Sequence, residues 1–409
     1  MAISKEERKI LTTKRWRILA VSCLINLCIG SMYAWSVLAA PMAEELQVAS
    51  LAIVFSIANA VGFITMIIGG LLNDKYGPRW VMFTGGIMFG VGMFTCGFAH
   101  SVNNLIFSYG ILLGLGLSLV YGCTISNTIK FFPDKRGLVG GMTTAFYGIS
   151  SVIFAPIANI LNSTFGVRTS FKILGAVFLV VICAGSLYME KCPAGFVPEG
   201  YVAPESSAKG KSQDMTPKEM LSTPVFYVML VMLTCGGVFG MMVISTARTL
   251  ATDMAGVSVA TASLLVSVLC LFNTAGRLVA GSLSDKLGRI NTLTGAMVIA
   301  LAGLFTLYIT DVTGSAALLT LGLILVGICF GTFMGVFPGF CTDQFGTRNN
   351  TVNYGIMWIG FSIAGLLGPT ILTKVHESTG QYRMAFVIAM CIAVVGLVLS
   401  FVYRKLSKS

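Results

Sequence analysis

The sequence is poor in charged side chains. Of its 409 residues, 11% are charged and 56% are apolar, and the mean hydropathy is +0.86. A water-soluble domain of this size needs roughly a quarter of its residues charged to cover its surface. The composition therefore excludes an ordinary soluble globular protein and predicts a membrane protein.

Histidines, paired cysteines and nucleotide motifs are also scarce. The two histidines, His100 and His376, fall in predicted outer loops, so no haem is expected within a helix bundle. Eleven cysteines are scattered without a C-x-x-C pair, which predicts neither a metal site nor a disulfide framework. No G-x-x-x-x-G-K-[ST] loop is present, and no segment between apolar runs is long enough for a nucleotide-binding domain. We therefore expect no enzyme activity and no cofactor.

Twelve apolar runs follow one another along the chain. About 20 such residues are needed to cross a hydrocarbon core as a helix, and an isolated strand could not satisfy its backbone in lipid. The runs cover approximately residues 18–40, 50–72, 80–99, 104–129, 138–161, 173–189, 225–247, 258–283, 291–310, 315–340, 352–373 and 384–403. The sequence thus predicts an all-α polytopic membrane protein that has the lipid bilayer as a partner.

The positions of the basic residues predict the topology. The net charge of +11 does not indicate nucleic-acid binding, because long uncharged runs separate the 27 Lys and Arg residues. With the N-terminus inside, the segments 1–17, 73–80, 130–137, 190–224, 284–290, 341–351 and 404–409 are inner and hold 21 of these 27 residues. This positive-inside bias predicts cytoplasmic termini. The basic stretch 1–17 lacks a cleavage site, so we expect the first helix to be retained.

A short motif occurs twice. Gly70 to Arg79 and Gly281 to Arg289 both read G-x-x-x-D-K-x-G followed by Arg, and their aspartates, Asp74 and Asp285, are 211 residues apart. Pro156 and Pro369 are offset by 213 residues. This repeat predicts two six-helix halves, 1–189 and 225–409, joined by a cytoplasmic linker, 190–224.

The repeated loop resembles the signature of the major facilitator superfamily. The resemblance implies two pseudo-symmetric six-helix halves and an inner latch, a charge cluster that favours the outward-open state. Its residues here are Asp74, Lys75, Arg79, Asp285, Lys286 and Arg289. Topology alone could account for the basic residues, but it does not account for two aspartates at equal spacing.

Arg277 is the one charged residue that falls well within a predicted span, and none of the 16 acidic residues lies in a span. A guanidinium at that depth costs at least about 2.5–3.5 kcal/mol, so it marks a site or a pathway by default. The partner it lacks is an anion, and its planar fork suits a carboxylate. Alternatively, Arg277 snorkels inward or bonds to helix carbonyls. Asn273, one turn earlier, shares its helix face and can orient it.

Other polar and aromatic side chains interrupt the spans. Any one of them more often packs between helices or lies at the interface. As a set, they could wall a small cavity around a carboxylate's apolar end. The residues in question are Asn26, Tyr33, Trp35, Asn59, Tyr121 and Trp358.

Longer stretches resemble the oxalate/formate antiporter family and, more distantly, the monocarboxylate transporters. They are Gly30 to Ser36, Val120 to Gly122 with Phe131 to Gly137, Asn273 to Arg277, and Asn353 to Trp358. The resemblance implies that Arg277 binds the substrate carboxylate, that Tyr33, Tyr121 and Trp358 wall the pocket, and that Asn59 takes the place of a glutamine.

Two positions depart from the oxalate carrier. Phe361 stands where that carrier has a lysine that supplies a second positive charge, and Phe330 stands where it has a tryptophan. A dicarboxylate would leave about one negative charge uncompensated at low dielectric, which costs several kcal/mol. We therefore expect a monocarboxylate such as lactate, pyruvate or formate to be preferred over oxalate.

The expected mechanism is alternating access around Arg277 in a plasma (inner) membrane protein that functions as a monomer. An empty carrier would occlude a bare guanidinium, which favours anion exchange or symport with a proton. An oxalate/formate exchanger, a carboxylate receptor that does not transport, and a channel are the alternatives.

Overall fold

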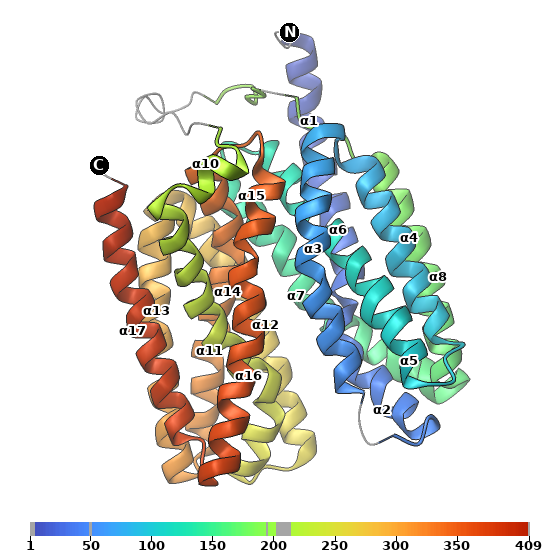
Figure 1. Cartoon of the computed structure of the whole chain (residues 1–409), viewed down its shortest axis with the longest axis vertical. Helices are drawn as coiled ribbons and strands as arrows, with labels where there is room; N and C mark the ends of the chain where they lie inside the picture. Colours follow the sequence, from blue (N-terminus) through green and yellow to red (C-terminus); the bar gives the residue numbers. More distant parts are fainter. Residues whose placement is uncertain (1–4, 49–50, 194, 202–213, 408–409) are drawn as a thin grey trace. The chain divides into compact units, whose positions relative to one another are not determined.

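The computed structural model describes residues 5–48, 51–193, 195–201 and 214–407, and every regular element in these ranges is a helix (Figure 1). Eleven of the described helices are long and apolar enough to cross a membrane. The all-α class predicted from the apolar runs is therefore confirmed. Of the predicted linker, residues 194 and 202–213 lie outside the described residues.

The third predicted span, 80–99, forms α4 (Pro78–Cys96), which is 19 residues long and is not among the eleven. Its four glycines, together with Arg79 and Trp80, lower its mean hydropathy. Its glycines also allow close packing: a Cβ on Gly90 would collide with Leu179 of α8 (Val167–Tyr188). The α4 helix is thus held by backbone proximity as well as by apolar burial.

The chain forms two compact units. Unit 1 comprises 1–139, 146–217 and 341–356, and unit 2 comprises 140–145, 218–340 and 357–409. Two short segments therefore belong to a different unit from the residues before and after them: 140–145 belongs to unit 2, and 341–356 belongs to unit 1. The division into halves at 190–224 stays a prediction.

Unit 1 contains the helices that correspond to the first six predicted spans. In it α4 packs on α8, and α3 packs on α6, as Figure 1 shows. Its remaining elements are α1 (Lys5–Ile29), η1 (Gly30–Ala34), α2 (Trp35–Glu45), α3 (Ala52–Tyr76), α5 (Val102–Leu105), η2 (Ile106–Leu113), α6 (Gly114–Lys130), α7 (Arg136–Phe165) and α15 (Asn350–Met357). Residues 140–145 of α7 belong to unit 2.

The first and fourth spans are not continuous α-helices. The first is broken by the 3₁₀ turn η1, where a Cβ on Gly30 would collide with the backbone of Tyr147. The fourth contains η2, a π-helical stretch, and such stretches are frequent at functional sites. These interruptions place Tyr33 and Tyr109 in locally irregular backbone.

Unit 2 contains the helices of the other predicted spans. Within it, α11 packs on α16 and α17, and α13 packs on α17. Its elements are α10 (Pro217–Leu221), α11 (Pro224–Ala255), α12 (Val259–Leu287), α13 (Arg289–Thr313), α14 (Ala316–Phe345), α16 (Ile359–Thr379) and α17 (Arg383–Leu406). From Cys341 onward, the end of α14 belongs to unit 1.

Candidate functional site

Arg277 lies on α12 and is among the largest fully buried side chains, with 1% of its surface exposed. Its Nε donates to Oδ1 of Asn273 at 3.2 Å, and its Nη1 donates to the backbone oxygen of Thr144 at 2.8 Å. Both partners are neutral acceptors. No acidic side chain among the described residues forms an ion pair with Arg277, so its positive charge is not neutralised there.

Three glycines let neighbouring backbone approach α12 at Arg277. A Cβ on Gly331 of α14 would collide with the carbonyl oxygen of Asn273, and one on Gly335 or Gly141 would collide with that of Arg277. The guanidinium is thus presented from a closely packed helix, with little room for the backbone to shift.

This packing predicts a stability effect. Replacing Gly331 by alanine forces α14 away from α12, and overpacking of this kind costs about 1–3 kcal/mol. We expect Gly331→Ala to lower the thermal midpoint of the purified protein by several degrees. Gly295→Ala in α13 is the matched control, because nothing lies within 4 Å of its added Cβ. Equal midpoints for Gly331→Ala and the wild-type protein would contradict the packing argument.

Aromatic side chains from two helices of unit 2 form one group. The Phe361 ring lies 4.4 Å from that of Trp358 and 6.2 Å from that of Phe330, measured between centroids. Phe330 is buried and precedes Gly331, the residue that packs on Asn273. The structure therefore brings together three of the predicted pocket residues in the unit that contains Arg277.

A second aromatic group lies in unit 1. The ring of Tyr147 packs edge-on against Tyr33 at 5.1 Å and against Tyr121 at 5.0 Å, so it joins two predicted pocket residues. Sequence reasoning missed Tyr147. The signal was available, because it is a tyrosine within the fifth apolar run, but no charge or motif distinguished it from a packing residue.

Two other predicted pocket residues lie apart from these groups. Trp35 is 6% exposed and packs on Tyr109 and Phe171, with ring centroids 4.0 and 6.4 Å away. Asn59 is exposed, and its Nδ2 donates to the carbonyl of Phe55 in its own helix. The ring contacts of Trp35 fit the packing alternative, and the place of Asn59 in a pocket wall stays a prediction.

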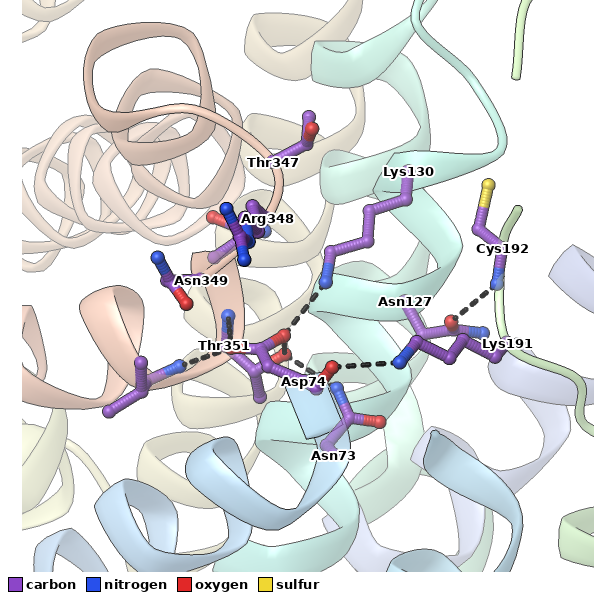
Figure 2. Close-up of polar contacts among 12 residues, drawn as sticks. Asn73, Asp74, Asn127, Lys130, Lys191, Cys192, Thr347, Arg348, Asn349 and Thr351 are labelled. Atoms are coloured by element: carbon purple, nitrogen blue, oxygen red, sulfur yellow. Dashed lines mark hydrogen bonds and ion pairs between the residues drawn. The ribbon is translucent and has the colours of Figure 1, made fainter. Parts of the chain in front are cut away.

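Asp74 of the predicted latch caps a helix in unit 1 (Figure 2). Its carboxylate accepts from Lys130 Nζ at 2.8 Å, from the backbone N–H groups of Thr351 and Val352 at 3.1 and 3.2 Å, and from the Thr351 hydroxyl at 2.9 Å. Thr351 and Val352 lie in the first turn of α15, whose unpaired N–H groups and dipole favour an anion. We call these four residues the Asp74 cluster.

Further polar contacts surround the cluster. Asn73 Nδ2 donates to Thr351 Oγ1 at 2.6 Å, and Asn127 contacts the backbone of Glu190 and Cys192. Burial raises the pKa of the Cys192 thiol to about 12, against a smaller opposite effect of Lys130. This thiol is therefore neutral at physiological pH.

The basic residues of the first motif lie differently. Lys75 is exposed and lies over the Tyr76 ring at 5.0 Å, and Arg79 Nε donates to the carbonyl of Met189 at 3.3 Å. Neither bonds to the Asp74 carboxylate in the structure. Lys130, which does, was not among the predicted latch residues, although it belongs to the next inner segment.

The second copy of the motif makes local contacts. Asp285, near the end of α12, pairs with Arg289, the first residue of α13, at 2.7 Å, and Arg289 also donates to Ser284 Oγ. Lys286 is exposed. The two copies are thus alike in sequence, but their aspartates have different kinds of partner in the contacts described.

These observations define a polytopic helical membrane protein with an arginine, Arg277, buried within one of its apolar helices and without an acidic partner among the described residues. Residues 19–369 match the family model of the Major Facilitator Superfamily. The chain belongs to that superfamily, as the repeated loop predicted.

Three relatives support a narrower grouping. The chain is 30% identical to the uncharacterised MFS-type transporter YhjX of Escherichia coli K12, with 86% of each chain covered. It is 27% identical to the oxalate:formate antiporter of Oxalobacter formigenes, covering 97% of this chain and 94% of that one. It is 26% identical to mouse monocarboxylate transporter 11, covering 96% and 88%. The predicted membership of an oxalate/formate antiporter-like family is confirmed.

A solved structure supports the fold. The outward conformation of FucP, a fucose:proton symporter of Escherichia coli, superposes with a TM-score of 0.71 at 13% identity and covers 94% of this chain and 98% of that one. The fold is therefore the polytopic major facilitator fold. The relatives are transporters and not enzymes, so the chain is a multi-pass membrane transporter of this superfamily.

Proposed function

We propose that the chain transports small monocarboxylates, such as lactate, pyruvate or formate, by alternating access, with Arg277 binding the carboxylate. The observation that carries this proposal is the buried Arg277, which has neutral acceptors but no acidic partner among the described residues. A buried charge without a counter-ion is costly, and a substrate anion removes that cost.

Asn273 supports this role for Arg277. Its Oδ1 holds Nε of the guanidinium, and the Thr144 carbonyl holds Nη1, so the plane of the fork is fixed from two sides. A fixed fork loses little entropy on binding a planar carboxylate. One of these two partners, the Thr144 oxygen, is a helix carbonyl. The structure thus also contains the contact on which the alternative interpretation of Arg277 rests, a bond to a helix carbonyl.

The aromatic group of unit 2 supports a monocarboxylate. Phe361, Trp358 and Phe330 supply apolar surface and no second positive charge. An apolar end next to the carboxylate, as in lactate or pyruvate, suits such a wall. A second carboxylate would lie uncompensated beside it.

An oxalate/formate exchanger is the second candidate, favoured by the similarity to the oxalate:formate antiporter over nearly the whole chain. Proteoliposomes preloaded with lactate, formate or oxalate distinguish the two. We expect lactate exchange to exceed oxalate exchange by at least tenfold. Strong oxalate exchange with little lactate uptake would overturn the substrate assignment.

Coupling follows from the electrostatics of the empty site. A loaded carrier is nearly neutral at Arg277, whereas an empty one must occlude a bare guanidinium. We therefore propose anion exchange, or symport in which a proton accompanies the anion. Asn273, the side chain that holds the guanidinium, is an amide, so this position offers no carboxylate to carry the proton.

We also propose that the Asp74 cluster acts as the inner latch of a plasma (inner) membrane carrier that functions as a monomer with both termini in the cytoplasm. The second motif, with Asp285, Lys286 and Arg289, would belong to the same latch, with an ion pair that joins the end of α12 to the start of α13. Lys75 and Arg79 would act mainly through the positive-inside bias, which sets the orientation of the chain in the membrane.

Removing the charge of Asp74 tests the latch. Asp74→Asn loses the pair with Lys130 and weakens the cap on α15, contacts worth about 1.5–3 kcal/mol. We expect the rate of anion exchange in proteoliposomes to fall tenfold or more. Amide hydrogen exchange at Thr351 and Val352 should become faster. Glu199→Gln, a charge removal at an exposed position outside the latch, is the matched control and should change both readouts by less than threefold. A wild-type rate of anion exchange in Asp74→Asn would exclude this carboxylate from the latch.

A further inference from the structure

The linker attaches to the Asp74 cluster near its start. Lys191 Nζ donates to the backbone carbonyls of Asp74 and Lys75, both at 2.9 Å. These carbonyls belong to the last turn of α3, where no residue further along the helix can satisfy them. Lys191 therefore holds the end of the helix that presents the Asp74 carboxylate (Figure 2).

The linker attaches again near its end. Asp214 Oδ1 accepts from the backbone N–H groups of Thr347 at 2.8 Å and Arg348 at 3.0 Å. These residues form the turn between α14 and α15, and the turn begins at Gly346 with φ of +88°. A side chain at Gly346 would be strained at that φ, and its Cβ would press on Asp214.

Met215 extends this second attachment. Its N–H donates to the carbonyl of Phe345 at 3.0 Å, and its carbonyl accepts from the side-chain amides of Asn349 and Asn353, both at 3.1 Å. Five hydrogen bonds thus join two consecutive linker residues to residues 345–353. The same stretch contains the N–H groups that Asp74 binds.

We propose that Lys191 and Asp214 are positioning residues of the latch, so that the linker fixes both partners of the contact between Asp74 and α15. The proposal rests on the proposed latch function. Lys191 sets the end of α3, which presents the anion, and Asp214 sets the turn that aims the first N–H groups of α15. The anion and the donors are then preorganised, which lowers the ordering cost of the contact.

A passive linker would join the two parts of the chain without any effect on this contact. Under that alternative, losing the Asp214 carboxylate would free the amides of Thr347 and Arg348 but leave those of Thr351 and Val352 protected by Asp74. Under the proposal, the disturbance passes along the turn to Thr351 and Val352. Amide protection at these two pairs of residues therefore separates the alternatives.

The test is hydrogen–deuterium exchange on the full chain in nanodiscs. We expect Asp214→Ala and Lys191→Gln each to speed amide exchange at Thr351 and Val352 by threefold or more. Glu199→Ala is the matched control, the loss of a carboxylate at an exposed position in the same linker, and should leave both amides unchanged. In proteoliposomes, Asp214→Ala should shift the ratio of outward-open to inward-open carrier in the same direction as Asp74→Asn.

Faster exchange confined to Thr347 and Arg348, with Thr351 and Val352 as in the wild type, would overturn the proposal. An Asp74→Asn variant that leaves Thr351 and Val352 equally protected would overturn it at its base. Amide exchange is measured without substrate. A wild-type protein that transported neither lactate, formate nor oxalate would therefore refute the proposed function while leaving this test intact.

Discussion

Replacing Arg277 by alanine should lower the exchange of labelled lactate about a hundredfold or more. The substitution removes the buried guanidinium and leaves Asn273 Oδ1 and the Thr144 carbonyl without the donor they now share. Truncating one partner of a buried charge pair costs about 2–5 kcal/mol, which spans this range. The loss should appear in kcat/KM for every carboxylate tested.

Arg277→Lys separates charge from geometry. An ammonium retains the charge, but it has no planar fork and cannot serve both present acceptors and a carboxylate with the same directions. We expect at least a tenfold loss. Arg248→Lys, at an exposed position on α11, is the matched control and should transport normally. Equal activity of Arg277→Lys and the wild-type protein would show that bidentate geometry is not used.

Introducing a second cation at Phe361 should change the substrate preference. Phe361→Lys places an ammonium beside Trp358, in the aromatic group of the unit that contains Arg277. A second positive charge would offset the uncompensated charge of a dianion, a term of several kcal/mol. We expect lactate exchange to fall and oxalate exchange to rise, so that their ratio changes a hundredfold or more.

Phe361→Leu is the control for this change. It removes the ring without adding charge, so it should weaken lactate transport modestly and bring no oxalate exchange. Direct binding of labelled oxalate to the purified variants checks that the change lies in recognition. If Phe361→Lys and Phe361→Leu have the same oxalate-to-lactate ratio, Phe361 does not exclude dianions.

The sequence was sufficient for the fold class and for the residue at the centre of the proposal. Apolar runs of membrane-spanning length are a strong signal, because lipid admits few structures other than helices. A lone arginine in such a run is equally conspicuous, because its insertion is costly. Asp74 was identified by its repeat, and the structure shows that its carboxylate accepts from backbone N–H groups at the start of α15.

The contacts were less predictable. Thr144 accepts a hydrogen bond from Arg277 with its backbone carbonyl. Any residue type would provide this carbonyl, so no sequence pattern could single out Thr144. Tyr33 and Trp35 are two residues apart in sequence, yet Trp35 packs on Tyr109 and Phe171 while Tyr33 packs on Tyr147. Asp285 repeats Asp74 in sequence but has a local partner.

The central claim is that Arg277 binds a monocarboxylate in a carrier cycle, and trans-stimulation tests it most directly. Uptake of labelled lactate is compared between empty proteoliposomes and proteoliposomes preloaded with unlabelled lactate, for the wild-type protein and for Arg277→Ala. The account predicts uptake at least tenfold faster into preloaded wild-type vesicles and no stimulation in the variant. Equal stimulation in both proteins, or none in the wild type, would contradict it.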